Sequence, residues 1–385
     1  MIALTAAALL TPLESLERPI VILDGSVVRE IACRNTCEIP RDCKVIDFGD
    51  DILAPGFIDI HIHGGGGHDV MESDARALPA VESLIARHGV TSYFPTTVTA
   101  PLEDTLRSLD RLATAIETRD DLDGGARARP LGIHLEGPFI SHARRGVHPP
   151  ACLLEPTLAA FERFWEAARG HIRVMTIAPE LPGALEVIAA AAKREVCVSL
   201  GHSDADIETT RAGIEAGARH ATHTFNAMRP LNHRDPGIVG VVLTDNRLSA
   251  DIIADGIHLD PAIVKLFLQS KGVDNAVLIT DATAATGMPD GRYRLGALEV
   301  QVKDGKCTSE GKLAGSVLTL DRAVRNAMEF GQWSLLDTVR AVTINPARIT
   351  NAMRRGHLQA GARADFVVLT RSGEVKQTVI GGRAS

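Results

Sequence analysis

Five apolar, strand-like segments of the chain end in imidazole or carboxylate side chains, the groups that hold divalent metals. Glu136 closes one of these segments, and a carboxylate there is expensive to bury unless it is paired or bound to a metal. Histidine and carboxylate donors together suit a catalytic divalent ion that keeps one position open for water. The pattern therefore favours metal-assisted chemistry, with these candidate residues: His61, His63, Glu136, His202, His223 and Asp281.

The first segment carries a His-x-His pair. Because side chains alternate along a strand, His61 and His63 face one side, while Ile60 and Ile62 face the other. Alone, the pair fits a metal site or two structural histidines; the coincidence with four other strand ends favours the metal site. We expect His134 to be a packed, hydrogen-bonded core residue, and seven further histidines to be surface or capping residues: His68, His88, His142, His171, His220, His233 and His357.

The middle of the chain alternates strand and helix patterns, which predicts an α/β fold with a TIM (β/α)8 barrel. In such a barrel the strand ends meet at one mouth, where ligands bind. A doubly wound sheet is the alternative, but no G-x-G-x-x-G follows the first strand. The expected strands are 56–63, 89–96, 130–136, 172–178, 196–201, 220–223, 248–254 and 276–281, and helix-length stretches include 74–88, 102–117, 183–194 and 204–216.

Both ends of the chain consist of short β-like pieces, and neither could bury a core alone. We therefore expect the two ends to pack into one small β-sandwich domain, made of residues 1–53 plus 346–385. Residues 54–345 would form the metal-dependent catalytic barrel. The apolar start, 1–12, has no basic region before it, and we interpret it as a strand rather than a signal peptide.

The composition excludes several classes of protein. Among 385 residues, 41 Lys and Arg against 48 Asp and Glu give a net charge of −7, which argues against nucleic-acid or anionic-membrane partners. An anionic ligand would need a local cationic pocket. No apolar run is long enough to span a bilayer. Six cysteines without a C-x-x-C pair indicate reduced thiols in a cytoplasmic protein, and a metal site at Cys33, Cys37 and Cys43 is the weaker alternative.

These motifs resemble the amidohydrolase superfamily and, within it, the N-acetylglucosamine-6-phosphate deacetylase family. The likeness covers essentially the whole chain. It rests on His61-x-His63, LEGPF at 135–139, Gly201-His202-Ser203, HTFNAM at 223–228, DGIH at 255–258, Asp281 and LAGS at 313–316. Other superfamily members bridge two metals with a strand-four lysine, whereas this chain has no lysine between Lys44 and Lys193.

The resemblance implies hydrolysis of the acetamide of N-acetylglucosamine 6-phosphate to glucosamine 6-phosphate and acetate. Another N-acyl substrate, such as N-acetylgalactosamine 6-phosphate, is the alternative, and a non-catalytic barrel is a third possibility that predicts eroded ligands. One or two divalent metals per subunit are implied, with zinc favoured and iron or another ion possible. A homodimer is implied, or a tetramer, with phosphate contacts that could cross the subunit interface.

The resemblance also implies a role for each residue. Glu136, His202 and His223 would form the main metal site, and His61 and His63 would add a second metal, with Glu136 bridging. Asp281 would move the proton, and His148 in Gly146-Val147-His148 would contact the substrate and stabilise the oxyanion. Arg234 would bind phosphate, and the other substrate contacts would be His148, Asn226, Ala227, His258, Leu313, Ala314, Gly315 and Ser316.

Overall fold

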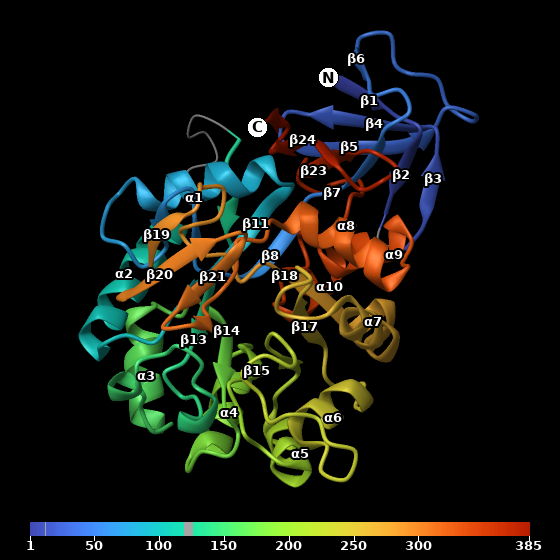
Figure 1. Cartoon of the computed structure of the whole chain (residues 1–385). Helices are drawn as coiled ribbons and strands as arrows, with labels where there is room; N and C mark the ends of the chain where they lie inside the picture. The colour runs from blue at the N-terminus through green and yellow to red at the C-terminus, as the bar shows by residue number, and fades with distance from the viewer. Residues whose placement is uncertain (12, 119–125) are drawn as a thin grey trace.

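Within the described residues, eight parallel strands form a closed barrel at the centre of the molecule (Figure 1). The computed structural model describes residues 1–11, 13–118 and 126–385. All eight strands expected from the sequence are present, so the predicted α/β barrel is confirmed. They are β8 (Phe57–Ile62), β11 (Val90–Thr97), β13 (Ile133–Glu136), β14 (Ile172–Ile177), β15 (Cys197–Leu200), β16 (His220–Ala221), β17 (Ala250–Ile253) and β18 (Ala276–Ile279).

Main-chain hydrogen bonds join these strands in chain order. β8, β11, β13, β14, β15 and β16 pair in parallel, and β17 pairs with β18. The Ala221 N–H donates to the Ser249 carbonyl at 3.0 Å and joins the two sheets. The Asp281 N–H donates to the His61 carbonyl at 2.9 Å and closes the ring. Closure therefore brings the end of the last strand directly beside the His-x-His pair.

Helices surround the barrel on the outside (Figure 1). The predicted stretch 102–117 is a helix with the same bounds, and its buried Thr105, Leu109 and Leu112 recur at the spacing of one helical face. Asp206 caps another helix by accepting the Thr209 N–H at 2.8 Å. The helices are α1 (Ala77–Arg87), α2 (Leu102–Glu117), α3 (Leu158–Ala167), α4 (Ala184–Lys193), α5 (Ile207–Ala216), α6 (Gly237–Thr244), α7 (Pro261–Asn275), α8 (Leu320–Gly331), α9 (Leu335–Ala341) and α10 (Ile344–Ile349).

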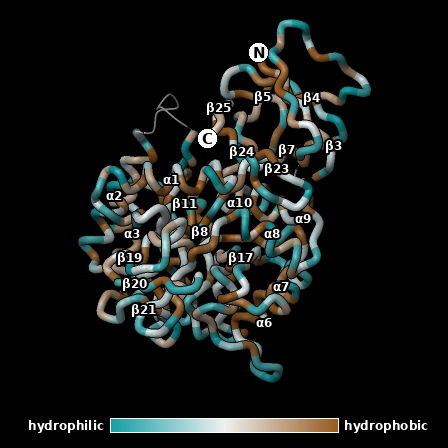
Figure 2. The backbone as a smooth tube through the Cα atoms, turned by 45° about the horizontal axis from the view of Figure 1, so that its top comes forward, coloured by the Kyte–Doolittle hydropathy of each residue, from teal (hydrophilic) through white to brown (hydrophobic). Residues whose placement is uncertain are grey.

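The barrel strands are buried along their whole length except at the partly exposed Arg173 of β14, because helices cover the outside and side chains fill the inside. Ile, Val, Leu and Ala dominate these strands, as the low aromatic content requires. Figure 2 shows hydrophobic stretches gathered in the interior and hydrophilic stretches in the peripheral loops. The polar residues at the strand ends are therefore exceptions that need a reason.

Strands from both ends of the chain lie together at one side of the barrel (Figure 1). One sheet has the order β5-β4-β1-β6 and the other the order β25-β24-β23-β7-β2-β3. Both contribute to one apolar cluster that includes Leu4, Val21 and Phe366. The strands are β1 (Ile2–Thr5), β2 (Ala8–Leu10), β3 (Ser15–Glu17), β4 (Pro19–Asp24), β5 (Val27–Cys33), β6 (Lys44–Asp47), β7 (Ile52–Pro55), β23 (Phe366–Leu369), β24 (Val375–Ile380) and β25 (Arg383–Ala384).

Two details differ from the sequence prediction. The apolar start forms two strands rather than one, and β1 and β2 belong to different sheets. A four-stranded antiparallel sheet, which the sequence pattern did not reveal, is inserted between β18 and α8 and reaches the barrel mouth. It consists of β19 (Gly291–Leu295), β20 (Leu298–Lys303), β21 (Lys306–Ser309) and β22 (Lys312–Leu313).

Asn345 ties α10 to the barrel. Its Nδ2 donates to the carbonyls of Val273 and Ala276, both at 2.8 Å, and the residue is 1% exposed. We expect Asn345→Ala to lower the free energy of unfolding by about 1–3 kcal/mol, because both buried carbonyls lose their donor. Urea unfolding measures this loss, and Asn246→Ala at an exposed position is the control. Equal stability of the two variants would contradict the role of Asn345.

Candidate active site

The side chains predicted from the strand ends converge on the carboxylate of Glu136. This residue ends β13 and is 3% exposed. Four imidazole Nε2 atoms approach its oxygens, at 3.3 Å for His61, 3.4 Å for His63, 3.3 Å for His202 and 3.1 Å for His223. The parallel strands deliver these groups from separate parts of the chain to one mouth of the barrel.

Backbone carbonyls fix how three of these imidazoles are protonated. Nδ1 of His63 lies 3.0 Å from the Thr96 carbonyl, that of His202 lies 2.9 Å from Arg144 O, and that of His223 lies 3.2 Å from Asn226 O. A carbonyl oxygen only accepts, so Nδ1 carries the hydrogen and Nε2 of the neutral ring presents a lone pair. Carbonyl-oriented imidazoles of this kind are typical of metal ligands.

The Nε2 atoms face one another in pairs at hydrogen-bond distance. His202 and His223 are 3.1 Å apart, and His61 and His63 are 3.2 Å apart. Two lone pairs repel at such a distance unless a proton or a cation lies between them. Buried nitrogen and carboxylate donors arranged in this way fit a divalent metal. Among the described residues, the donor groups close enough for an ion lie at this mouth and do not include Cys33, Cys37 or Cys43.

His148 differs from the four histidines around it. Its Nδ1 accepts the Thr99 N–H at 3.3 Å and lies 2.8 Å from Thr99 Oγ1. Nε2 therefore carries the hydrogen and points toward Glu136, 3.7 Å away. Burial, and then the nearby His202, lowers the pKa of His148 to about 3. This neutral imidazole presents an N–H, rather than a lone pair, to the pocket.

The electrostatics of the cluster follow from this packing. Burial raises the pKa of Glu136, but the neighbouring imidazoles, His61 first, outweigh burial and hold it well below its ordinary value. Burial lowers the pKa of His223, but the hydrogen bond to Glu136 and the negative charges of Glu136, Asp281 and Asp251 together outweigh burial and raise this pKa to about 9. The pKa of His63 is likewise raised, because Asp281 and Glu136 outweigh burial. Without a cation, protons occupy the space between the donors.

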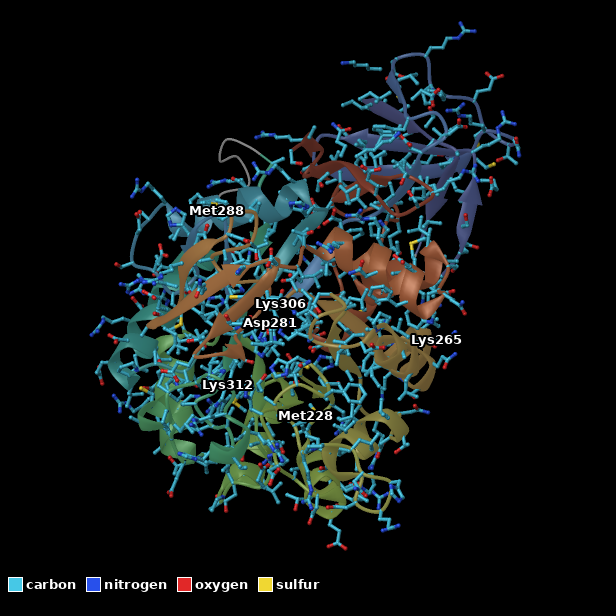
Figure 3. The ribbon with its side chains drawn as sticks, in the orientation of Figure 1. Met228, Lys265, Asp281, Met288, Lys306 and Lys312 are labelled. Atoms are coloured by element: carbon cyan, nitrogen blue, oxygen red, sulfur yellow. The ribbon has the colours of Figure 1, made fainter. Side chains whose placement is uncertain are left out.

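Asp281 completes the cluster beside the His-x-His pair. Its Oδ1 lies 3.1 Å from His63 Nε2 and 3.6 Å from His61 Nε2. Burial raises its pKa, but these imidazoles outweigh burial and lower it to about 2. Asp281 is therefore an ionised carboxylate that can accept a proton at neutral pH. Figure 3 labels Asp281 near the middle of the molecule.

The pocket next to these groups is lined by most of the predicted substrate residues. They are His148, Asn226, Ala227, His258, Leu313, Ala314 and Gly315. Nδ2 of Asn226 is buried and has no hydrogen-bond partner among the described residues, so it is free to donate to a ligand. Gly315 has a φ of +58°, and a Cβ there would come within 2.9 Å of the Asp281 carbonyl, so this close approach requires glycine.

Two predicted substrate residues lie outside the lining. Ser316 is buried beside the pocket, where its hydroxyl donates to the Thr280 carbonyl at 2.6 Å. Arg234 is exposed on the loop before α6, and its N–H donates to Asn232 Oδ1 at 3.0 Å. None of the described lining residues is Lys or Arg.

Two other histidine predictions are settled by their contacts. His134 is buried, with ring nitrogens 3.0 Å from the Ile60 carbonyl and 2.8 Å from Thr176 Oγ1, which confirms the core assignment. The surface or capping assignment of His220 is wrong. His220 is completely buried and its Nε2 lies 2.8 Å from Asp251 Oδ2. The available sequence signal was Asp251 on the next strand, but the residue pattern alone does not show that Asp251 contacts His220.

The sequence did not reveal several pocket residues. Thr99 orients His148 but follows a strand that ends without an ionisable group. Val98, Ile253 and Leu295 add an apolar wall, and Leu295 comes from the inserted sheet. A polar residue two positions after the second barrel strand was the one available signal for Thr99.

A model described as the amidohydrolase family matches residues 52–384. The chain belongs to the amidohydrolase family. Within this family it is similar to the N-acetylglucosamine-6-phosphate deacetylase of Bos taurus, with 41% identity over 91% of this chain and 86% of the relative. It is also similar to the N-acetylgalactosamine-6-phosphate deacetylase of Escherichia coli O157:H7, with 39% identity over 89% of this chain and 90% of the relative.

A solved structure agrees with this assignment to the amidohydrolase family. A variant of the N-acetyl-D-glucosamine-6-phosphate deacetylase from Mycobacterium smegmatis, in complex with N-acetyl-D-glucosamine-6-phosphate, superposes with a TM-score of 0.92. The identity is 35%, and the match covers 100% of this chain and 98% of that chain. The resemblance seen in the sequence motifs is thereby confirmed.

We expect metal binding at this amidohydrolase site to release protons and to strengthen as the pH rises. A histidine ligand must be deprotonated, and the pKa of His223 is raised to about 9 in the metal-free cluster. Between pH 7 and 8.5, affinity should increase about tenfold per pH unit for each proton displaced. Chelator competition with Co²⁺ measures this dependence, with the exposed variant His233→Asn as control. A metal affinity that does not change with pH would contradict the displacement of protons from the histidine cluster.

Proposed function

We propose that the chain hydrolyses the acetamide of N-acetylglucosamine 6-phosphate to glucosamine 6-phosphate and acetate. One observation carries the proposal. An ionised acid, Asp281, and a neutral donor, His148, flank a cluster of four Nε2 atoms around Glu136. These are the groups that attack of water on an amide requires. The match to deacetylases over nine-tenths of the chain supports the substrate class.

The cluster fits a divalent ion, and we propose zinc. Glu136, His202 and His223 would hold the main ion, and His61 and His63, sharing Glu136, would hold a second. Their lone pairs converge in a buried site, which supports this assignment. A bound divalent ion would supply water acidified to a pKa of about 7 and positive charge near the carbonyl oxygen.

Asp281 carries the proton, and His148 stabilises the negative charge that develops on the carbonyl oxygen. Asp281 accepts the proton of the attacking water and passes it to the sugar nitrogen, so that nitrogen leaves as an amine. Its lowered pKa keeps it ionised before attack. The Nε2–H of His148 donates to the carbonyl oxygen as negative charge develops there. Thr99 holds the His148 tautomer through its N–H, so the donor is oriented before substrate arrives.

Recognition of the sugar phosphate uses the other side of the pocket. Asn226 Nδ2, the Ala227 backbone and His258 would donate to the sugar and phosphate. Leu313, Ala314 and Gly315 would shape the wall, with Ser316 packed beside it. His258 is oriented by its hydrogen bond to Asp255, 2.8 Å away. We propose a homodimer, in which the phosphate meets Arg234 of the partner subunit. The exposed position of Arg234 in its own chain supports this arrangement.

A galactosamine epimer is the second candidate substrate. The similarity to a relative named N-acetylgalactosamine-6-phosphate deacetylase, at 39% identity, favours its inclusion. Both epimers offer the same acetamide to Asp281 and His148, so the same machinery would act on either. Only the contacts at the C4 hydroxyl would discriminate between them.

The function is tested by amine release from purified, metal-analysed chain. N-acetylglucosamine 6-phosphate, its galactosamine epimer and unphosphorylated N-acetylglucosamine are compared side by side. Rapid turnover of the first, and little of the unphosphorylated sugar, supports the proposal. Faster turnover of the epimer would move the assignment to the second candidate. No turnover of any of them with metal bound would overturn the proposal.

Asp281→Asn should lower kcat by about 10²–10⁴-fold while the chain retains its Glu136-centred metal. The amide cannot accept the proton of the attacking water, although it keeps the shape of the carboxylate. Steady-state kinetics and elemental analysis of the same preparation measure both quantities. Asp290→Asn, at an exposed position, is the control. A variant with unchanged kcat would exclude Asp281 as the proton carrier.

Arg234→Ala should raise KM for the phosphorylated substrate and leave metal content unchanged, with exposed Arg211→Ala as control. Mixed dimers make the test sharper. In a dimer of one Arg234→Ala chain and one Asp281→Asn chain, the site that keeps Asp281 also receives an intact Arg234 from its partner. Activity should therefore return in mixed dimers prepared with two affinity tags. Mixed dimers that remain inactive would place the phosphate contact within one chain or elsewhere.

The remaining assignments concern organisation. We propose that residues 1–53 and 346–385 form a separate β-sandwich domain, supported by the shared apolar cluster of the two terminal sheets. The boundary at 53 falls inside β7, and that at 346 falls inside α10. No described helix combines the length and apolar character needed to cross a bilayer. We propose a cytoplasmic location, on the basis of the reduced cysteines.

A further inference from the structure

His202 and His223 have backbone conformations that histidine seldom adopts. Their φ angles are +47° and +30°, in or near the left-handed region. There the Cβ crowds the backbone, so a residue stays in this conformation only where its surroundings hold it. The two residues end neighbouring strands, β15 and β16, and both rings aim Nε2 at the same oxygen of Glu136. Both turns therefore need support from outside the ligand set.

Asp251 on β17 supports the turn at His223. Its Oδ1 accepts the His223 N–H, and its Oδ2 lies 2.8 Å from His220 Nε2. The Asp251 main-chain carbonyl accepts the Thr224 N–H at 2.9 Å. Asp251 is 1% exposed. A single buried residue thus holds the chain on both sides of the His223 Cα.

Glu180, just after β14, supports the turn at His202. Its Oε2 accepts the Ser203 hydroxyl at 2.7 Å, and its Oε1 accepts the Asp204 N–H at 2.6 Å. Ser203 Oγ in turn accepts the Ala205 N–H at 3.1 Å. The chain that leaves His202 is therefore fixed by one carboxylate over three consecutive residues.

The two supports have matching positions in the barrel. β14 and β17 flank the pair β15 and β16, and each flanking strand supplies one carboxylate to the turn of its neighbour. Neither carboxylate lines the pocket, and neither lies among the metal donors. Their hydrogen bonds go to backbone N–H groups, the Ser203 hydroxyl and the His220 imidazole, so both carboxylates act on the loops that carry the two ligands.

We infer that Asp251 and Glu180 are positioning residues, which hold His202 and His223 at their left-handed turns so that both Nε2 atoms reach one metal beside Glu136. This inference rests on the metal dependence of the proposed function. If either turn relaxed toward an ordinary φ, its imidazole Nε2 would move away from the Glu136 oxygen that both rings now approach. Loss of either support should then weaken metal binding before it affects the substrate pocket.

The test measures Zn²⁺ affinity of the metal-stripped full chain by competition with a chelating indicator, without substrate. We expect Asp251→Ala and Glu180→Ala to weaken the apparent Kd by about 10–100-fold. Asp251→Asn and Glu180→Gln should stay close to the unaltered chain, because an amide oxygen can accept the same N–H. The matched control is Asp206→Ala, which also removes a carboxylate that accepts a backbone N–H, 2.8 Å from Thr209, but at an exposed helix cap.

The outcomes distinguish a positioning role from an effect of negative charge and from a loss of folding. Equal losses in the alanine and amide variants would mean that negative charge matters, and would overturn the inference, as would an unchanged Kd in the alanine variants. Circular dichroism and urea unfolding of the metal-free variants check the fold. If Asp251→Ala does not fold, the Glu180 pair decides, since Glu180 is only half-buried.

Kinetics add an independent readout. In metal-saturated variants, KM for the sugar phosphate should equal that of the unaltered chain, and a raised KM would contradict pure positioning. The affinity measurement needs no turnover. Failure of the proposed deacetylase reaction would therefore leave the positioning result standing, and failure of positioning would leave the reaction standing.

Discussion

The buried carboxylate of Glu136 is the interaction on which the rest of the site depends. A desolvated carboxylate is stable only beside positive charge or strong donors. Here that environment comes from imidazoles on β8 and just after β15 and β16, which are remote in sequence. Only a closed barrel with the observed parallel register brings those strand ends around a residue of β13. The fold and the charge of Glu136 therefore constrain each other.

The loops after the strands contribute through their main chain as much as through their side chains. The carbonyls of Thr96, Arg144 and Asn226 orient three imidazoles, and the Thr99 N–H orients a fourth in the opposite tautomer. Residue type alone cannot separate these roles, because every one of the rings is a histidine. What distinguishes His148 from His63, His202 and His223 is whether Nδ1 faces an N–H group or a carbonyl.

Much of the barrel was predictable, because apolar runs with polar ends recur at the spacing of β/α units. The six strand-end residues were predictable for the same reason, since parallel strands bring their ends to one edge. The inserted sheet β19–β22 was not, because its alternating exposed pattern resembles any surface hairpin. The pairing of His220 with Asp251 was also missed, because it depends on the relative register of β16 and β17 rather than on spacing along the chain.

Charge sets the remaining constraint on the pocket. The chain carries a net charge of −7, and its barrel mouth holds the carboxylates of Glu136 and Asp281, yet the proposed substrate adds a phosphate. No lysine or arginine among the described residues lines the pocket. Divalent metal would balance the two carboxylates and leave the phosphate to neutral donors such as Asn226. A guanidinium would still match phosphate geometry best. Among the described residues the lining holds no guanidinium, and Arg234, which we propose for this role, lies on an exposed loop.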